Sequence, residues 1–247
     1  MNNFLAPLMT GAEKLGLTVT EEQQTLFWRF FQLMLERNAQ INLTAITEPR
    51  EVAIKHFVDS LTVELVHHFS DGQRIIDIGT GAGFPGIPLA IRYPEVEMVL
   101  NDSVGKKVDF LADVARALPL PNVTPIWARA EALGRDKTHR GQYHAVMIRA
   151  VAHLAILAEY ALPLLRLHGV CIAMKGPNGE RELMESEQAL DLIGGKVREV
   201  RKVTLEEAGE RVLIVIEKSC GTPECYPRET GMARKKPLFL DSSKGDA

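Results

Sequence analysis

The sequence predicts an α/β fold: a Rossmann-like, mostly parallel sheet of seven strands with a small N-terminal helical cap. Three observations predict it. Apolar residues recur at helical spacing within the first 70 residues, short apolar runs alternate with helical stretches from about residue 71, and a glycine-rich turn follows the first of those runs. With 247 residues, 46% of them hydrophobic, the chain is long enough to bury the core of one such domain.

Residues 1–70 are expected to form the helical cap. Thr20 and Gln23 have the spacing of a capping box, and apolar residues recur at helical intervals from there to Arg37. A second helix is expected to begin near Pro49, a residue suited to a first helical turn. The apolar residues that follow it are spaced four apart: Ala53, Phe57, Leu61 and Leu65.

Residues 71–218 are expected to form the sheet domain. Two apolar segments near its end, 197–203 and 211–217, have no long helix between them, which predicts an antiparallel hairpin that closes the sheet. Residues 219–247 contain prolines and several basic side chains and are expected to form an extended basic tail. Five earlier apolar runs are expected to be parallel strands: 74–78, 97–100, 123–127, 145–148 and 170–174.

The composition argues against three classes of protein: one attracted to nucleic acid by its overall charge, a metalloprotein and a membrane protein. A formal net charge of −3 and a pI near 6.2 give no general attraction to nucleic acid, so RNA binding requires local basic patches. The three cysteines show no CxxC spacing and the histidines no metal-ligand spacing, which predicts free thiols and no metal. No basic N-terminal region and no apolar run of about 18 residues are present, so we expect a soluble, cytoplasmic protein, by default a monomer.

The segment 77–83 reads DIGTGAG and directly follows the first predicted strand. Gly79, Gly81 and Gly83 would let a nucleotide-like ligand approach the backbone, and the next helix would offer it unpaired N–H groups. From Gly81 onward the sequence also matches GxGxxG, and Asp102 lies about twenty residues further on, as in a dinucleotide site. The glycines alone therefore leave S-adenosylmethionine and NAD open.

Asp77 favours S-adenosylmethionine. A carboxylate just before the first glycine attracts the positively charged methionine end of that cofactor, whereas it would repel the pyrophosphate of NAD. The terminal hairpin also resembles the seven-stranded sheet of methyltransferases, and the length leaves no room for the catalytic half of a dehydrogenase. Asp102 is placed to accept hydrogen bonds from both ribose hydroxyls of either ligand. The alternative is a glycine turn that only tightens a strand-to-helix connection.

Several motifs occur in a specific order: Asn42-Leu43-Thr44, 56–60 (HFVDS), 77–86, Lys106-Lys107 and 174–177 (MKGP). Together they resemble the bacterial small-subunit (16S) ribosomal RNA guanine-N7 methyltransferase family, also called glucose-inhibited division protein B. The similarity runs from about residue 20 to residue 238 and includes two tail motifs, 226–228 (YPR) and 236–238 (KPL). It implies cofactor contacts by Gly79, Phe84, Asp102, Ser103, Val104, Ala130, Glu131 and Arg149.

Two of these positions also suit the cofactor on their own chemistry. Phe84 could cover an apolar face of the cofactor, and Glu131 follows a predicted strand at the sheet edge where ligands bind. An acid at a helix N-terminus, favoured by the helix dipole, is an equally good interpretation of Glu131.

The sequence also bears on which atom is methylated. Residues 147–151 lack the Asn/Asp-Pro-Pro-aromatic loop typical of exocyclic amine methylation, and no cysteine lies in a motif suited to pyrimidine C5 chemistry. Guanine N7 exposes an in-plane lone pair, so its methylation needs positioning and no general base. Arg149 is interpreted as the catalytic residue, a clamp on cofactor and substrate. The alternative is a structural ion pair with a carboxylate at the sheet edge.

The substrate-binding candidates are basic or polar. His56, Asp59 and Ser60 share a helix face and, with Asn42, are expected to line the substrate cleft. A slightly favoured alternative places them in an internal hydrogen-bond network between cap and sheet. A phosphate-binding patch is expected from the basic residues near the cleft and in the tail, each of which could also be a solvated surface charge: Lys106, Lys107, Arg149, Lys175, Arg234, Lys235 and Lys236.

The expected partner is ribosomal RNA or the small ribosomal subunit. Three other functions stay open at this point: methylation of another RNA or a small molecule, a nonenzymatic ribosome-associated protein, and an NAD-dependent oxidoreductase.

Overall fold

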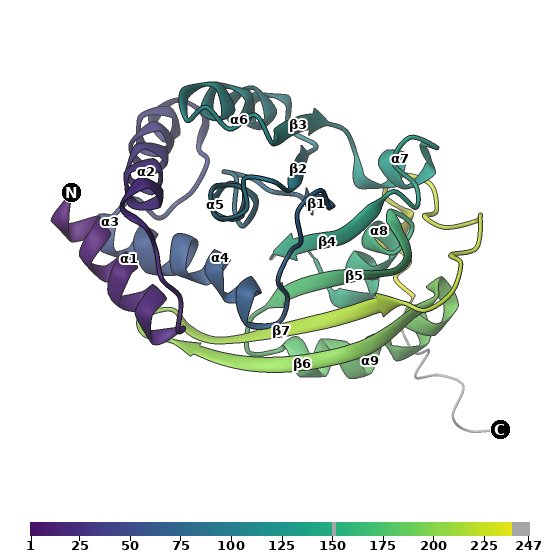
Figure 1. Cartoon of the computed structure of the whole chain (residues 1–247). Coiled ribbons are helices and arrows are strands. Elements are labelled where there is room, and N and C mark those ends of the chain that lie inside the picture. Colours follow the sequence, from purple (N-terminus) through teal and green to yellow (C-terminus); the bar gives the residue numbers. More distant parts are fainter. Residues whose placement is uncertain (150–151, 239–247) are drawn as a thin grey trace.

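The computed structural model describes residues 1–149 and 152–238, and within these ranges seven strands form one sheet (Figure 1). The strand order is β3-β2-β1-β4-β5-β7-β6. The first five strands are parallel, and β7 runs antiparallel to β5 and β6. The predicted fold class is confirmed. The strands are β1 Arg74–Ile78, β2 Glu97–Asp102, β3 Val123–Trp127, β4 Tyr143–Arg149, β5 Leu165–Lys175, β6 Gly195–Leu205 and β7 Gly209–Lys218.

The strand order creates a crevice at one edge of the sheet. The chain runs from β1 outward to β2 and β3, then returns to β4 on the other side of β1. Parallel strands place their carboxyl ends at the same edge, and ligands of such sheets bind where the order reverses. The sequence-predicted strands all lie inside the observed ones. β5 begins earlier than predicted, at Leu165. Residues 166–168 in this added part are exposed and form no apolar run, so no sequence pattern indicated it.

Successive residues of β1 face two separate cores. Ile75 packs with the cap on one face of the sheet, whereas Ile76 packs with α7, α8 and α9 on the other. Helices α5 and α6 contribute to the first core. The helices that follow the parallel strands are α5 Gly86–Arg92, α6 Gly105–Ala117, α7 Ala130–Arg135, α8 Leu154–Ala161 and α9 Gly179–Ile193.

The cap consists of α1 Asn2–Lys14, α2 Glu21–Ile41 and a series of short helical segments, and its aromatic side chains interlock. The capping box predicted at Thr20 is present at the start of α2. Helix α1 was not predicted, because Pro7 and Gly11 interrupt its pattern. Gly11 is needed there: a Cβ atom would lie 2.6 Å from Val58 Cγ2, so only glycine allows α1 to approach that closely.

The second cap helix begins at Pro49 as predicted, but it is not one regular helix. It comprises α3 Pro49–Val52, a π-helical turn η1 Ala53–Val58, α4 Asp59–Leu61 and a 3₁₀ turn η2 Thr62–Leu65. A π-helical turn is wider than an α-helical one, so it shifts the side chains that follow it around the helix axis, and such turns often occur at functional sites. Here the turn leads directly into Asp59, which reaches the sheet edge.

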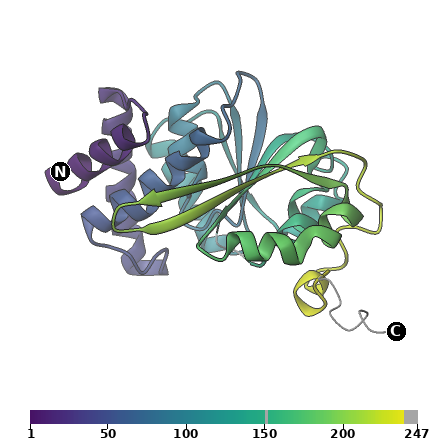
Figure 2. The same cartoon turned by 90° about the horizontal axis from the view of Figure 1, so that it is seen from below.

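The β6–β7 hairpin extends beyond the sheet to the cap, as Figure 2 shows. At its tip Glu207 accepts hydrogen bonds from Arg50 of the cap, with 2.6 Å between Arg50 Nη2 and Glu207 Oε1. No helix among the described residues is long and apolar enough to cross a membrane.

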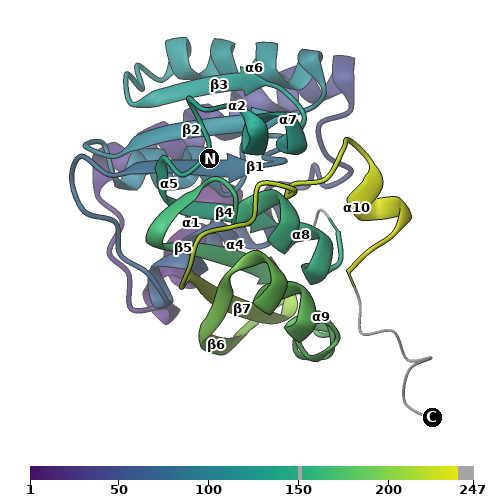
Figure 3. The same ribbon diagram turned by 90° about the vertical axis from the view of Figure 1, so that its right-hand side faces the viewer.

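The described part of the tail is not simply extended. It contains a one-turn helix, α10 Met232–Lys235, and it runs back past α8 to the carboxyl-end side of the sheet (Figure 3). Residues 150–151, at the end of the loop motif that follows the fourth strand, and tail residues 239–247 lie outside the described ranges.

Candidate functional site

The glycine turn after β1 has the backbone that its sequence predicts. Gly79, Gly81 and Gly83 all have positive φ angles, of 68°, 61° and 98°. A side chain is excluded at Gly83, where a Cβ atom would lie 2.7 Å from Ile87 Cγ1, and at Gly86, where it would lie 2.2 Å from Leu100 Cδ2. The turn is therefore fixed both by its left-handed conformation and by close packing.

Asp77 lies fully buried beneath this turn. Its Oδ2 atom accepts hydrogen bonds from Thr80 Oγ1 at 2.6 Å and from the Gly86 N–H at 2.9 Å. Its Oδ1 atom is also buried but has no hydrogen-bond partner among the described residues. Burial raises the pKa of this carboxyl to about 6, although both hydrogen bonds act in the opposite direction. A buried, unpartnered carboxylate oxygen is costly, and a bound cation would relieve it.

Asp102, the last residue of β2, also binds the turn. Its Oδ2 atom accepts a hydrogen bond from the Gly81 N–H at 3.0 Å, and Oδ1 accepts one from the Val104 N–H at 2.9 Å. Each carboxylate oxygen has a second lone pair, so Asp102 keeps the capacity to accept hydrogen bonds from two ribose hydroxyls. The same residue thus connects the β1 and β2 ends of the crevice.

A cavity of about 430 Å³ opens at these strand ends, a size typical of small-molecule sites. Val104, an apolar side chain that is 45% exposed, lies in its wall. Of the residues predicted to bind the cofactor, six line it: Gly79, Asp102, Ser103, Val104, Ala130 and Glu131. Five do not: Asp77, Gly81, Gly83, Phe84 and Arg149.

Arg149, at the end of β4, lies instead in a neighbouring recess of about 250 Å³ that also contains Lys55, His56 and Lys175. Its Nη1 atom is 3.0 Å from Asp59 Oδ2, and its guanidinium lies over the ring of Phe84. The Arg149–Asp59 pair agrees with the alternative interpretation of Arg149, a structural ion pair. The role of Arg149 as a clamp on cofactor and substrate stays a prediction.

Asp59 joins three parts of the molecule. Its second oxygen, Oδ1, accepts a hydrogen bond from Arg211 Nε of β7 at 2.6 Å. The carboxylate is buried and paired with two arginines, so it joins the cap to strands β4 and β7 at the edge of the recess. The sequence indicated Asp59 but gave Arg211 no role.

Phe84 and His56 contact each other between the glycine turn and the cap, and neither lines the cofactor cavity. Phe84 is buried and stacks on the His56 imidazole, with 4.9 Å between ring centroids. His56 Nε2 lies 2.9 Å from Thr44 Oγ1, and burial together with nearby Arg149 lowers the pKa of the imidazole to about 4. Asn42 ends α2 in the left-handed conformation. These contacts agree with the favoured alternative, an internal network between cap and sheet.

The predicted basic residues divide between different places. Lys175 is buried: its Nζ atom is 2.7 Å from Glu182 Oε2 and 2.6 Å from the Ala152 carbonyl oxygen, so its charge is already paired. Arg234 lines the cofactor cavity, whereas its neighbour Lys235 lines neither cavity nor recess. Lys107 shares the cofactor cavity with Arg234, and Lys175 shares the recess with Arg149, so these predicted cations lie at two places and do not form one patch.

The comparisons with known proteins agree with this geometry. Residues 23–213 match the model of the family described as GidB, rRNA small subunit methyltransferase G. The chain belongs to this family. The ribosomal RNA small subunit methyltransferase G of Pelotomaculum thermopropionicum is 46% identical over 96% of this chain and 100% of that protein. Its counterpart in Deinococcus radiodurans is 46% identical over 94% of this chain and 92% of that protein.

A solved structure with this fold is that of a mutant 16S rRNA (adenine(1408)-N(1))-methyltransferase from Catenulisporales acidiphilia. It superposes with a TM-score of 0.52 at 16% identity, over 62% of this chain and 88% of that one. At that identity the likeness shows the shared fold alone.

For a member of the methyltransferase G family, the cavity fits S-adenosylmethionine on its own chemistry. Asp77 holds a buried, partly unpartnered carboxylate beneath the turn, Asp102 keeps lone pairs for hydroxyls, and Val104 supplies an exposed apolar surface. The negative charges of Asp102 in the cavity wall and of Asp77 buried beneath the turn disfavour a pyrophosphate, and therefore NAD.

Several lining residues were not found from the sequence. Asn101, buried next to Asp102, donates through Nδ2 to the carbonyl oxygens of Ile126 and Ala128 and so joins the ends of β2 and β3. Its position at a predicted strand end is the signal that could have indicated it. The remaining unpredicted lining residues are Ile78, Ala128, Arg129, Tyr160, Thr230 and Gly231.

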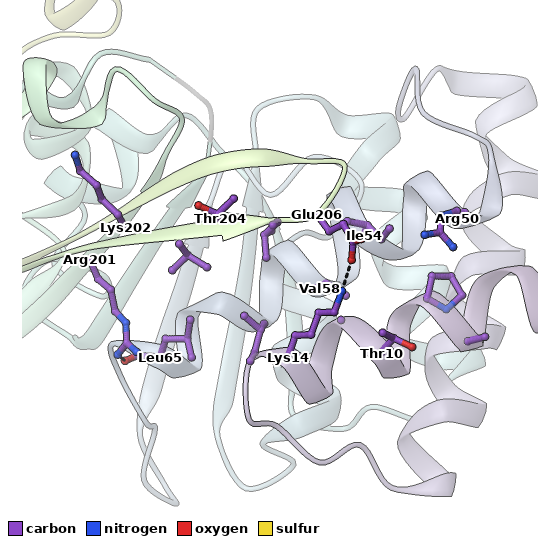
Figure 4. A pocket seen from close by; sticks show the side chains of 16 residues that line it. Thr10, Lys14, Arg50, Ile54, Val58, Leu65, Arg201, Lys202, Thr204 and Glu206 are labelled. Atoms are coloured by element: carbon purple, nitrogen blue, oxygen red, sulfur yellow. Dashed lines mark hydrogen bonds and ion pairs between the residues drawn. The ribbon is translucent and has the colours of Figure 1, made fainter.

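A second large cavity, of about 420 Å³, lies between α1, η1 and the hairpin (Figure 4). None of its lining residues belongs to the glycine turn. Its cations already have partners in the described chain: Lys14 pairs with Glu206, and Arg201 donates to the Leu65 carbonyl oxygen. It is therefore not the cofactor site.

Proposed function

We propose that this member of the methyltransferase G family transfers the methyl group of S-adenosylmethionine to N7 of a guanine in small-subunit (16S) ribosomal RNA. The observation that carries the proposal is the buried, unpartnered Oδ1 of Asp77 beneath a glycine turn that borders a cavity of about 430 Å³. The relatives named above act, by their names, on small-subunit ribosomal RNA.

The residues around the cavity have distinct roles in this proposal. Asp77 attracts the ammonium group of the cofactor, and Asp102 accepts the ribose hydroxyls. The strand-end residues after β2 and β3 surround the adenine: Ser103, Val104, Ala130 and Glu131. Gly79 leaves the turn open to the ligand at the cavity wall, whereas Gly81 and Gly83 allow its left-handed backbone. The cofactor itself supplies a methyl group made electrophilic by the sulfonium.

The neighbouring recess is proposed to receive the guanine. The N7 lone pair forms the new bond to the methyl carbon while the electrons of the carbon–sulfur bond return to sulfur, so no proton has to be removed. His56, with its pKa lowered to about 4, is neutral at pH 7 and is not required as a base. Arg149, fixed by Asp59, is proposed to position the guanine or its phosphate.

The substrate-binding roles of Asn42, His56 and Lys175 are now indirect. The side chains of His56 and Lys175 are engaged inside the protein, so we propose that they shape the recess rather than grip RNA phosphates, whereas Asn42 is exposed and we propose that it lies near the entrance. Lys235, on the one-turn helix of the tail, stays a candidate for a phosphate contact. We also propose a monomer that acts where the ribosomal subunit is, in the cytoplasm; light scattering of the purified protein tests the first part.

The direct test is methyl transfer. Purified protein is incubated with methyl-labelled S-adenosylmethionine and either small subunits or naked 16S RNA that lack the modification. Label in the RNA at one guanine, with chain scission after borohydride and aniline as 7-methylguanine gives, supports the proposal. Label on another atom or in another class of RNA contradicts the N7 assignment, and no label in any RNA contradicts the ribosomal RNA substrate.

A further inference from the structure

The C-terminal tail forms one wall of the cofactor cavity. Thr230, Gly231 and Arg234 line it together with the ends of β1 and β2 and the start of α7. The Gly231 N–H donates a hydrogen bond to Glu131 Oε1 at 2.9 Å. Glu131 is buried and is itself one of the residues proposed to hold the cofactor. The tail thus contacts the cofactor site directly, although it is about 100 residues away in the sequence.

The tail is held in this place by contacts that do not involve Arg234. Arg228 forms a bidentate ion pair with Glu159 of α8, whose side chain is only 1% exposed. Arg135 donates to the Pro227 carbonyl oxygen at 2.9 Å. A third guanidinium, that of Arg140, donates to the carbonyl oxygens of Thr222, Pro223 and Tyr226. Three arginines of the chain therefore fix the tail through charge-assisted hydrogen bonds.

Besides these hydrogen bonds, the tail packs closely against α7 and α8. Gly134 of α7 faces Pro227, and a Cβ atom at Gly134 would lie 2.8 Å from Pro227 Cγ. Ala233 of α10 is buried in a small apolar cluster with Ile156 and Tyr160 of α8. The α10 turn is therefore docked on the protein by its own small residue, which places the next residue, Arg234, at the cavity.

The surroundings of Arg234 suit the adenosyl part of the cofactor. Val104 supplies an exposed apolar side chain in the same cavity, and Tyr160 also lines it; burial raises the pKa of the Tyr160 hydroxyl, and nearby Arg234 acts in the opposite direction. A guanidinium is planar, stacks on aromatic faces and carries five N–H donors. An adenine offers two such faces and ring nitrogens that accept hydrogen bonds.

We propose that Arg234 is a cofactor-binding residue that contacts the adenosyl part of S-adenosylmethionine, and that the anchored tail exists to place it there. The proposal rests on the proposed function of the cavity. It replaces the RNA contact that the sequence predicted for Arg234 and leaves that role to Lys235.

Isothermal titration calorimetry with S-adenosylhomocysteine tests the proposal on the full chain without any turnover. Arg234→Ala should weaken binding by about 10-fold or more, as loss of a charge-assisted contact predicts. Lys235→Ala is the matched control, because it removes the same charge from the same helical turn but lines no cavity. It should change the dissociation constant by less than about twofold.

A second ligand locates the contact. 5′-Methylthioadenosine lacks the amino acid part, so Arg234→Ala should weaken its binding by the same factor. Amide hydrogen exchange of residues 230–236 in the unsubstituted protein should slow when S-adenosylhomocysteine binds. Thermal unfolding verifies that Arg234→Ala is folded.

Three outcomes overturn the proposal. Arg234→Ala binds S-adenosylhomocysteine like the unsubstituted protein and loses only RNA affinity, or it loses affinity for S-adenosylhomocysteine but not for 5′-methylthioadenosine, or exchange in residues 230–236 is unchanged by ligand. Failure of the cavity's proposed function gives a different result, because the unsubstituted protein then binds neither ligand.

Discussion

At the scale of single residues, the two oxygens of Asp77 have different surroundings, and we propose that one serves the turn and the other the cofactor. One oxygen holds the turn through Thr80 and Gly86, whereas the other is buried without a partner among the described residues. Burial of this charge is unfavourable for the protein alone, and for the same reason it raises the pKa of the carboxyl to about 6. A buried charge that destabilises the fold is typical of a residue kept for its ligand.

Asp77→Asn separates the two roles. The amide oxygen can still accept the bonds from Thr80 and Gly86, while the amide nitrogen replaces the unpartnered Oδ1. We expect S-adenosylhomocysteine to bind about 10–100-fold more weakly, since a hydrogen bond to a charged group is lost. The melting temperature at pH 7 should be unchanged or higher. Exposed Asp71→Asn is the control for both measurements, and a clear drop in melting temperature for Asp77→Asn alone would contradict this assignment.

The same carboxyl predicts a pH dependence. In the folded chain its pKa is raised from 3.8 to about 6, so protonation on lowering the pH from 7 to 5 removes the charge that attracts the ammonium group. Cofactor affinity should therefore fall over that range. Because the folded state binds this proton more tightly than the unfolded state, the group's contribution to stability decreases as pH rises from about 4 to about 6. Calorimetry from pH 5 to pH 8 checks the first effect, and in Asp77→Asn the decline in affinity should be absent or much smaller.

Arg211 is predicted to stabilise the recess through Asp59. Arg211→Gln leaves the buried Asp59 carboxylate with Arg149 alone, which should cost about 1–3 kcal/mol of unfolding free energy. Arg50→Gln, at an exposed pair with Glu207, is the matched control and should show no resolvable change. Urea denaturation measures both. Equal stability of the two variants would mean that the Asp59 carboxylate does not depend on Arg211.

At the scale of elements, two irregular segments bring residues to the site: the π-helical turn of the cap and the C-terminal tail. The π-helical turn η1 precedes Asp59, and the tail brings α10 to the cavity. Neither can be inferred from local patterns. A π-helical turn changes the helical register by one residue inside an apolar sequence that is spaced for an α-helix. The tail's basic and proline-rich composition is typical of solvated chain, and its ordering depends on arginines 135 and 140, far from it in the sequence.

The Arg228–Glu159 ion pair, which anchors the tail on α8, can be tested by mutation. Arg228→Met leaves the buried Glu159 carboxylate without its main partner, which should cost about 3–5 kcal/mol of unfolding free energy. The double variant Arg228→Met with Glu159→Leu removes both charges and should recover much of that loss. Chemical denaturation compares them. No recovery in the double variant would show that the ion pair is not what fixes the tail.

At the scale of the whole molecule, the sheet could be predicted from the sequence because each buried strand is a short apolar run. The glycine turn and Asp102 could be predicted because they follow such runs directly. The surroundings of Arg149 could not be deduced, since Asp59 lies 90 residues from Arg149 and 152 residues from Arg211 in the sequence. Helix α1 was missed because Pro7 lies inside it, where a proline removes a helix hydrogen bond and usually marks a helix end.

The central claim is that the strand-end cavity of this chain holds S-adenosylmethionine. Calorimetric titration of the purified protein with S-adenosylhomocysteine and, separately, with NAD tests it most directly. The structure predicts one S-adenosylhomocysteine bound per chain and no heat of binding with NAD, because the charges of Asp102 in the cavity wall and of Asp77 buried beneath the turn would repel a pyrophosphate. Binding of NAD without binding of S-adenosylhomocysteine would contradict it.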